Sequence, residues 1–261
     1  MNGTAAVARF DSYAHLPAEV LDDALVRIEA DPDVLHGAWI TEGGYALAST
    51  DGYGGDPCWL HVAGRPEVAA ALLEAAIAHL GEACCGLTVP RGVDLARWIP
   101  DGEPGEWDLM RCDRAPAAQP GEDRVAALTD LAAVQAFLDR VNPHHSVRAD
   151  HREVERWMGV ADEAGGGLLA VGAFTRRVSG TAYLASIATD EQARGQGLGG
   201  AVTAALTRHA FASGDGLCTL AHYHPNDPAR RVYQRLGYRT THQNRSHALP
   251  RQAAAEDRTD A

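Results

Sequence analysis

The sequence has no long apolar run, and this absence narrows the class of protein. None of its hydrophobic stretches approaches the ~18 residues that a helix needs to cross a bilayer. The N-terminal segment MNGTAAVARFDSY has no basic region followed by an apolar stretch, so it does not resemble a secretory signal. Hydrophobic residues still make up 46% of the 261 positions, which is enough for a packed core. We therefore expect a soluble cytoplasmic protein with no membrane partner.

Lysine is also absent, because all 23 basic residues are arginine. They face 35 acidic residues, which gives a net charge of −12. A protein with this negative charge is poorly suited to bind the phosphate backbone of DNA or RNA, so we expect no nucleic-acid partner. The charge is uneven: residues 1–123 carry −14 and residues 124–261 carry +2. This asymmetry favours two regions with different partners.

Cysteine is scarce and is not spaced for metal binding. The five cysteines form no C-x-x-C pair and no Cys/His cluster with zinc spacing. An odd number of cysteines fits reduced thiols. We expect no metal in this protein.

Segment 113–123, DRAPAAQPGED, contains two prolines and a glycine and little that can pack. It predicts a linker between an N-terminal α/β domain, residues 1–112, and a second domain, residues 124–249. The polar and aperiodic residues 250–261 predict a frayed tail.

Hydrophobic periodicity predicts a similar series of elements in each half. In the first half these are helix Leu16–Ala30, strands Ala38–Thr41 and Tyr45–Ser49, strand Trp59–Val62, helix Glu67–Leu80, strand Gly86–Val89, helix Val93–Trp98 and strand Trp107–Cys112. In the second half they are helices Leu128–Val141 and His151–Met158, strands Leu168–Phe174 and Thr181–Ala188, helix Leu198–Ala212, strand Leu217–His222, helix Pro228–Leu236 and a strand from Tyr238. Residues 58–112 align coarsely with 181–241, which favours a tandem duplication; two unrelated α/β segments would give the same pattern.

Residues 194–199, RGQGLG, connect a predicted buried strand to an Ala/Leu/Val-rich helix. Glycines let the main chain turn tightly and approach a ligand, and the free N–H groups of a helix start attract an anion. Phosphate is the natural occupant, with Arg194 as a cation at the rim; a glycine-rich turn without a ligand is the simpler alternative. The stretch also fits the dinucleotide fingerprint G-x-G-x-x-G, but Asp215 precedes the next strand instead of ending it, and too little chain follows for a doubly wound sheet.

A second pattern follows the next strand, at Asn226-x-x-Ala229-x-x-x-Tyr233-x-x-x-Gly237-Tyr238. With R-x-x-G-x-G at 194–199, it resembles the GNAT superfamily of acyl-CoA-dependent N-acyltransferases over about residues 124–247. The resemblance implies an α/β (α+β) fold with a mixed, mainly antiparallel sheet. The smaller α/β domain before it is then either a degenerate GNAT copy or an unrelated segment.

The resemblance also implies acetyl-CoA as co-substrate. Its diphosphate would lie on the main-chain N–H groups of Arg194, Gly195, Gln196, Gly197, Leu198 and Gly199. The central strand would pair with the pantetheine arm through Ile187, Ala188 and Thr189. Asn226 would lie near the same arm.

Tyr233 falls where the family carries a tyrosine close to the sulfur, so it would donate a proton to the leaving thiolate as general acid. The alternative is a ring that only packs against the last strand. The central strand, TAYLASIA at 181–188, lacks the Glu that many members use as general base. His222, at the end of the next strand, and His224 are the candidates for this role, although a lone His at a strand end is more often structural.

Tyr183 and Ser186 are polar positions on the central strand that would orient the acceptor. The loop Asn142–Arg148 would form a wall of the acceptor site, or would be a solvated turn. The first half has only Gly64-Arg65-Pro66 where the phosphate loop would fall, and the proline removes an N–H that an anion needs. We expect no CoA there; the acidity of this half favours a cationic acceptor or is a solubilising surface.

The sequence thus predicts an N-acetyltransferase. It would move acetyl from acetyl-CoA to a primary amine of a small molecule by direct attack in a ternary complex. The alternatives are a protein or peptide N-acetyltransferase and a non-catalytic acyl-CoA-binding regulator. A monomer and a homodimer both fit.

Overall fold

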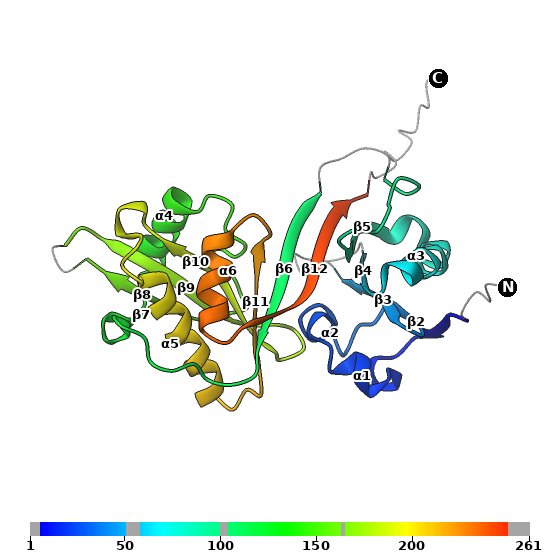
Figure 1. Ribbon diagram of the computed structural model, residues 1–261, viewed down its shortest axis with the longest axis horizontal. Helices are drawn as coiled ribbons and strands as arrows, with labels where there is room; N and C mark the ends of the chain where they lie inside the picture. Colours follow the sequence, from blue (N-terminus) through cyan, green and yellow to red (C-terminus); the bar gives the residue numbers. More distant parts are fainter. Residues whose placement is uncertain (1–5, 51–57, 100–103, 163–164, 250–261) are drawn as a thin grey trace, which may run out of the picture. The chain divides into compact units, whose positions relative to one another are not determined.

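The computed structural model describes residues 6–50, 58–99, 104–162 and 165–249 (Figure 1). The chain divides into two compact units. The first unit comprises the described residues within 1–21, 30–106 and 244–261, and the second comprises those within 22–29 and 107–243. Each unit therefore contains segments from both halves of the sequence.

In the first unit the strand order is β1-β2-β3-β4-β5-β12, and helix α3 packs on β2, β3 and β4. The bounds are β1 Ala8–Phe10, α1 Ala18–Leu21, β2 Gly37–Thr41, β3 Gly44–Thr50, β4 Cys58–Gly64, α3 Pro66–Leu80, β5 Cys84–Pro90 and β12 Arg239–Ala248, of which Asn244–Ala248 pair with β5. Neighbouring strands are antiparallel except for the parallel pair of β4 and β5. Single 3₁₀ turns occupy Tyr13–His15 and Gly81–Ala83.

In the second unit the strand order is β7-β8-β9-β10-β11-β6. The bounds are α2 Ala24–Glu29, β6 Gly105–Cys112, of which Trp107–Cys112 pair with β11, β7 Ala126–Leu128, α4 Leu131–Val141, β8 Val154–Ala161, β9 Leu168–Arg176, β10 Ala182–Thr189, α5 Leu198–Ala212, β11 Cys218–Tyr223 and α6 Asp227–Arg235, with 3₁₀ turns at Glu122–Arg124 and Glu191–Ala193. Only β10 and β11 are parallel. The mixed, mainly antiparallel sheet expected from the sequence is confirmed.

The two units share one strand pattern. In each, three antiparallel pairs are followed by one parallel pair and then by one antiparallel pair. Helix α3 joins the parallel strands of the first unit, and α5 joins those of the second. In each, the last strand comes from the other half of the chain: β6 pairs with β11, and Asn244–Ala248 pair with β5. This repetition supports a tandem duplication in which the copies have exchanged their last strands.

The sheet of the second unit is covered on both faces. On one face, Leu184 and Leu220 join the buried side chains of α5, including Leu206, in one cluster. On the other face, Ala185 belongs to a separate cluster with Phe137 of α4 and with other buried residues. Strand β10 is thus buried on both sides, as its apolar sequence predicts.

Several local expectations hold to within a few residues, and α5 has the predicted bounds. Helix α4 begins after Asp130, whose carboxylate accepts a hydrogen bond from Ala133 N at 3.0 Å and caps the helix. The hairpin of β2 and β3 turns at Gly43, which has φ +92°.

Other expectations are wrong. The predicted helix His151–Met158 is wrong: from Val154 onward the chain forms strand β8, because Val154–Ala161 pair with β9, Trp157–Gly159 also pair with β7, and this pairing outweighs the local helical pattern. Leu16–Ala30 is split into α1 and α2, since Asp23 accepts from Leu25 N at 2.8 Å and starts a new helix. Val93–Trp98 forms turns, one of them closed by Ile99 N to Leu95 O at 2.8 Å.

The boundaries of the two units differ from the domain boundaries predicted from the sequence. Strand β6, assigned to the N-terminal domain, pairs with β11 in the second unit, and the end of β12 pairs in the first. Segment 113–123, expected as a linker, ends in a turn where Glu122 pairs with Arg208 of α5 at 2.8 Å. The predicted tail 250–261 lies outside the described residues.

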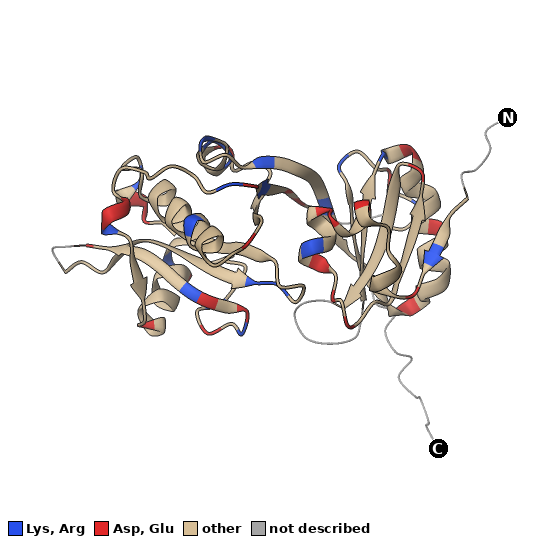
Figure 2. Ribbon diagram, turned by 90° about the horizontal axis from the view of Figure 1, so that it is seen from below, with Lys and Arg blue, Asp and Glu red and all other residues tan. Residues whose placement is uncertain are grey.

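Acidic and basic positions are interspersed along both units (Figure 2), so neither unit carries charges of a single sign. Within the described ranges, no helix combines the length and the apolar character needed to span a bilayer.

Candidate active site

Strands β10 and β11 run side by side for only three residues. Their register pairs Ala182 to Leu184 with Cys218 to Leu220, and beyond these positions the strands are no longer paired although both continue. On its other edge β10 stays paired with β9 as far as Thr189. The main chain of β10 from Ala185 to Thr189, including Ile187 and Ala188, therefore has one edge without a strand partner, and an extended ligand can pair there.

A bulge marks the point of separation. The register of β10 against β9 shifts between Ala185 and Ala188, and Ser186 has φ +49°, a left-handed conformation that costs energy for a side chain other than glycine. The Ser186 hydroxyl donates to Val147 O and accepts from Val147 N, both at 3.1 Å. Ser186 is buried, so it fixes the loop 142–148 against the central strand. The sequence analysis predicted that Ser186 orients the acceptor, whereas its hydrogen bonds in the structure are to this loop.

The glycine loop, Arg194–Gly199, follows β10 and leads into α5. Gly195 and Gly197 have φ +79° and +80°, and a Cβ atom at either position would have no neighbour within 4 Å. No acceptor within the described part of the chain binds the N–H groups from Gly195 to Gly200, and Gly197 caps the helix without a side-chain hydrogen bond. Six N–H groups at the positive end of a fifteen-residue helix thus make an open anion site.

The surroundings of the glycine loop are polar and closely spaced. Arg194 is mostly exposed and lies 3.6 Å from Glu191, so its guanidinium is available at the rim. A Cβ atom at Gly199 would lie 2.9 Å from the Thr189 hydroxyl, so glycine is required there for the helix to approach β10. Of the main-chain N–H groups predicted to hold a diphosphate, that of Arg194 instead donates to Glu191 O at 3.3 Å, and those from Gly195 to Gly199 remain open.

Asn226 begins helix α6. Its side-chain oxygen accepts from Ala229 N at 3.2 Å and caps the helix. Its amide NH₂ donates to no described residue and is exposed. The cap is a structural role that the sequence did not anticipate, and it leaves two donors for a ligand.

Tyr233 lies on the inner face of α6, 7% exposed, with its ring centroid 6.0 Å from that of His222. Burial raises the pKa of Tyr233 to about 12. The phenol is therefore protonated at neutral pH and is a proton donor. Its ring also lies 6.1 Å from that of Tyr238, so part of the packing role considered from the sequence is present too.

His222 is buried near the end of β11, where Nδ1 donates to Tyr223 O at 2.8 Å. Its Nε2 is buried, has no hydrogen-bond partner among the described residues, and lies 4.0 Å from Asp108 Oδ2. His224, 45% exposed at its side chain, approaches the same oxygen with Nδ1 at 3.4 Å. Two histidines therefore face one buried carboxylate.

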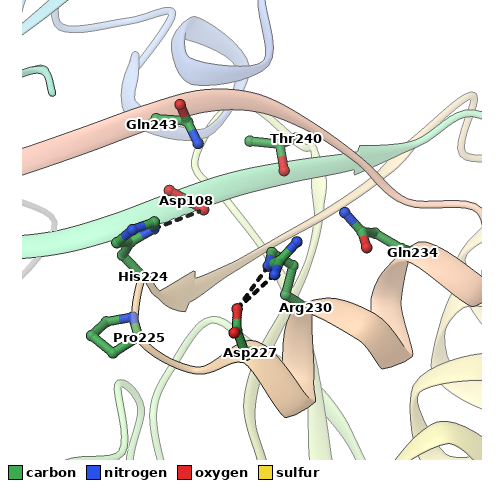
Figure 3. Close-up of a pocket in the computed structure, with 8 residues that line it drawn as sticks. All are labelled: Asp108, His224, Pro225, Asp227, Arg230, Gln234, Thr240 and Gln243. Carbon is green, nitrogen blue, oxygen red and sulfur yellow. Dashed lines mark hydrogen bonds and ion pairs between the residues drawn. The ribbon is translucent and has the colours of Figure 1, made fainter.

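Asp108 and His224 also line a pocket of about 400 Å³ between α6, β6 and β12 (Figure 3). Its other lining residues are Pro225, Asp227, Arg230, Gln234, Thr240 and Gln243. Figure 3 shows the ion pair of Arg230 with Asp227, 2.6 Å long, on the α6 wall. The pocket is polar and is large enough for a small molecule.

The sequence model of the acetyltransferase (GNAT) family matches residues 125–238. Residues 125–238 are a GNAT acetyltransferase domain. The glycine loop, the separated strands, Asn226 and Tyr233 all lie within this GNAT domain. The match spans less than half of the chain.

Solved structures extend the likeness over both units. A GNAT-family protein from Novosphingobium aromaticivorans is 21% identical, with a TM-score of 0.52, over 78% of this chain and 86% of its own. A GCN5-related N-acetyltransferase from Kribbella flavida is 18% identical, with a TM-score of 0.50, over 87% of this chain and 91% of its own. One from Sphaerobacter thermophilus is 14% identical, with a TM-score of 0.51, over 82% and 81%. At these identities they show a shared fold. No curated protein matches the sequence.

Besides its bonds to Ser186, the loop before β8 is held by hydrogen bonds within itself and to α4. His145 Nδ1 donates to Asn142 O at 3.0 Å, and Gln135 of α4 accepts from Ala149 N at 2.9 Å. The main chain also turns here, because His145 N donates to Asn142 O at 2.9 Å, and most of residues 143–148 are exposed. The solvated turn considered from the sequence is therefore present, with Val147 as its buried anchor, and a role as a wall of the acceptor site stays a prediction. Tyr183, the other polar position on β10, lies half-buried with the Arg177 guanidinium 5.5 Å from its ring centre.

Asp108 is the residue of this site that sequence reasoning missed. It lies on β6, outside the GNAT match and in the half of the chain assigned to another domain. Only the pairing of β6 with β11 brings Asp108 opposite His222. Its one signal in the sequence is a charged residue inside a mainly apolar strand. Within the described residues no group of three or more His, Cys, Asp or Glu side chains is arranged to hold a metal ion.

Proposed function

We propose that the protein is an N-acetyltransferase that moves the acetyl group of acetyl-CoA to a primary amine of a small molecule. The observation that carries this proposal is the row of unpaired N–H groups from Gly195 to Gly200, in a GNAT domain whose central strands part beside it. Acyl transfer from acyl-CoA is the chemistry of this family; the acetyl group and the small amine are the finer parts of the proposal.

The residues present fit coenzyme A. The N–H groups of Gly195, Gln196, Gly197, Leu198 and Gly199 would bind the diphosphate, with Arg194 at the rim. The free main-chain edge at Ile187, Ala188 and Thr189 would pair with the pantetheine amides as an added strand. The Asn226 NH₂ group would donate to the same arm.

Tyr233 would act on the leaving sulfur. Because its phenol stays protonated well above neutral pH, it can donate a hydrogen bond to the thiolate as negative charge develops. A main-chain N–H at the β10 bulge would stabilise the carbonyl oxygen in the same way. Holding the amine beside the thioester supplies the remaining acceleration.

His222 is the base that the geometry favours over His224. A carbonyl oxygen only accepts, so Nδ1 of His222 carries the proton toward Tyr223, and in the neutral ring the lone pair is on Nε2. That nitrogen is buried and its ring lies 6.0 Å from that of Tyr233, whereas the imidazole of His224 is nearly half exposed.

Thiol release from acetyl-CoA tests the proposal. The wild type is assayed with a panel of alkyl diamines, amino sugars, amino-acid amides and peptides. Release that depends on a small amine supports the proposal, and release that depends only on a peptide favours a peptide acetyltransferase. Release without any acceptor shows hydrolysis alone, and tight acetyl-CoA binding without release favours a regulator; either result contradicts the proposal.

A further inference from the structure

Asp108 and His222 are direct partners in the antiparallel pair of β6 and β11, so their side chains project from the same face of the sheet. Both are buried, at 1% and 7% exposure. The closest approach, Nε2 to Oδ2 at 4.0 Å, is too long for a hydrogen bond. No hydrogen bond therefore links these two atoms, although the side chains face each other.

The missing element between them is a donor. With Nδ1 donating to Tyr223 O, the neutral His222 ring offers only a lone pair at Nε2, and the Asp108 carboxylate also only accepts. A buried acceptor without a donor is costly, which makes the lone pair of Nε2 an exception that calls for an explanation.

We infer that the amine to be acetylated binds between His222 Nε2 and Asp108 Oδ2, as a primary ammonium. This inference rests on the proposed function. A nitrogen about 2.9 Å from both acceptors would make two bonds at an angle of about 90°, within reach of the donors of one ammonium group. Asp108 selects the positive charge, and His222 takes the proton that the amine must lose before it attacks.

The chemistry then balances. One proton passes from the ammonium to His222 Nε2, and the resulting imidazolium is paired with Asp108. The amine nitrogen forms the C–N bond as the C–S bond breaks. Tyr233 gives its proton to the sulfur, and the second proton released by the nitrogen restores the phenol.

The position of Asp108 also indicates how the acceptor enters. Its carboxylate belongs to the wall of the 400 Å³ pocket (Figure 3), and His222, opposite it in strand register, has its ring centroid 6.0 Å from that of Tyr233. Arg230, Gln234 and Gln243 present polar groups from the other walls. The acceptor is therefore a small primary amine, positively charged at neutral pH, with a polar body.

The test compares Asp108→Asn with Asp113→Asn. The control changes another carboxylate just beyond β6, one that pairs with Arg239 at 3.3 Å outside the pocket. For the amines that the wild type accepts, we expect Asp108→Asn to lower kcat/KM by ~10–100-fold, because a charge-assisted hydrogen bond is lost. Acetyl-CoA affinity by calorimetry should stay within about twofold for both variants, and Asp113→Asn should keep kcat/KM.

A structural ion pair would behave differently. Aminooxy analogues of the accepted amines are uncharged at neutral pH, so their turnover should fall less in Asp108→Asn than that of the amines themselves. An equal loss for charged and uncharged acceptors, or an equal loss of acetyl-CoA affinity, overturns the inference. So does an unchanged kcat/KM.

A second measurement does not depend on turnover. The ring-nitrogen NMR signals of His222 are observed directly and are assigned by their loss in the His222→Gln variant. Amines of the panel should shift the His222 signals in the wild type and not in Asp108→Asn. If no amine shifts them in the wild type, the amine site is wrong, although acetyl-CoA binding can still hold. If the amines shift His222 while acetyl-CoA does not bind, the amine site stands and the proposed transferase fails.

Discussion

The two units place the same junction, from a strand to a long helix, at the same topological position and build it differently. In the second unit β10 leads through eight residues, 190–197, with two left-handed glycines into α5. In the first unit β4 passes through Arg65 into α3, which begins with Pro66. The proline has no N–H, and the Arg65 side chain lies against Gly43 and donates to Glu42 O at 3.3 Å. One junction exposes donors and the other covers them.

The parallel strands differ as well. Strands β4 and β5 are still paired at His61 and Thr88, three residues before β4 ends, whereas β10 and β11 part five residues before β10 ends. The Trp59 indole lies over Gly86 and donates to Thr88 at 2.8 Å. A shared topology therefore does not by itself make a cofactor site; the local sequence at one junction decides it.

The largest effect is expected from a substitution among the free N–H groups of Gly195 to Gly200 in the second unit. Gly197→Glu puts a carboxylate among the free N–H groups, and we expect acetyl-CoA affinity in calorimetry to fall at least ~100-fold. Gly214→Glu is the matched control, since Gly214 has φ +93°, open surroundings and a place just beyond the other end of α5. Both variants carry the left-handed strain of about 1–2 kcal/mol, but only the first should lose binding. Equal losses would mean that folding, not the anion site, was damaged.

The next test concerns the tyrosine of the second unit. Tyr233→Phe should lower kcat by ~10–1000-fold with little change in acetyl-CoA affinity. With a pKa of about 12 the phenol stays protonated between about pH 6 and 9, so the fold-loss should be the same across this range. Tyr238→Phe removes a hydroxyl that bonds Thr207 at 2.7 Å and should cost about 1–3 kcal/mol of stability without lowering kcat. An unaltered kcat in Tyr233→Phe would remove this residue from the mechanism.

A smaller effect distinguishes two buried serines. Ser186→Ala leaves the N–H and C=O of Val147 without their partner, at a cost of about 1–3 kcal/mol, and should raise KM for the amine by loosening the loop 142–148. Ser49→Ala in the first unit removes its hydrogen bond to His61, 3.1 Å long, and should cost about 1 kcal/mol without affecting KM. Thermal unfolding and amine kinetics measure both; a raised KM in Ser49→Ala would show that the comparison fails.

The smallest effect is expected at the first junction. Arg65→Glu reverses a charge at the start of α3, the position that corresponds to the glycine loop. Because Pro66 and the packed glycines leave no donor row there, acetyl-CoA affinity should change by less than about threefold. A large loss would show that the first unit also binds the cofactor.

The sequence is informative where local chemistry decides the structure. The glycine loop and helix α5 depend on residues that are adjacent in the chain, so their pattern predicts both their positions and the anion site. Strand β8 could not be predicted in this way, since its pairing with β7 and β9 is a tertiary effect. Residues 151–158 show no alternation strong enough to indicate it.

The exchange of last strands was beyond sequence reasoning for the same reason. Nothing in the residues of β6 indicates that it pairs with β11 rather than with strands of its own half. Asp108 could therefore not be connected to His222, and the candidate base remained a lone histidine. The structure places Asp108 opposite His222 through strand register.

Glycine-selective amide NMR during an acetyl-CoA titration tests the central claim directly, because it observes both junctions in one sample. The account predicts that the N–H signals of Gly195, Gly197 and Gly199 shift with the cofactor while that of Gly64 does not. Unchanged signals in the glycine loop at saturating acetyl-CoA, or a shift confined to Gly64, would contradict it.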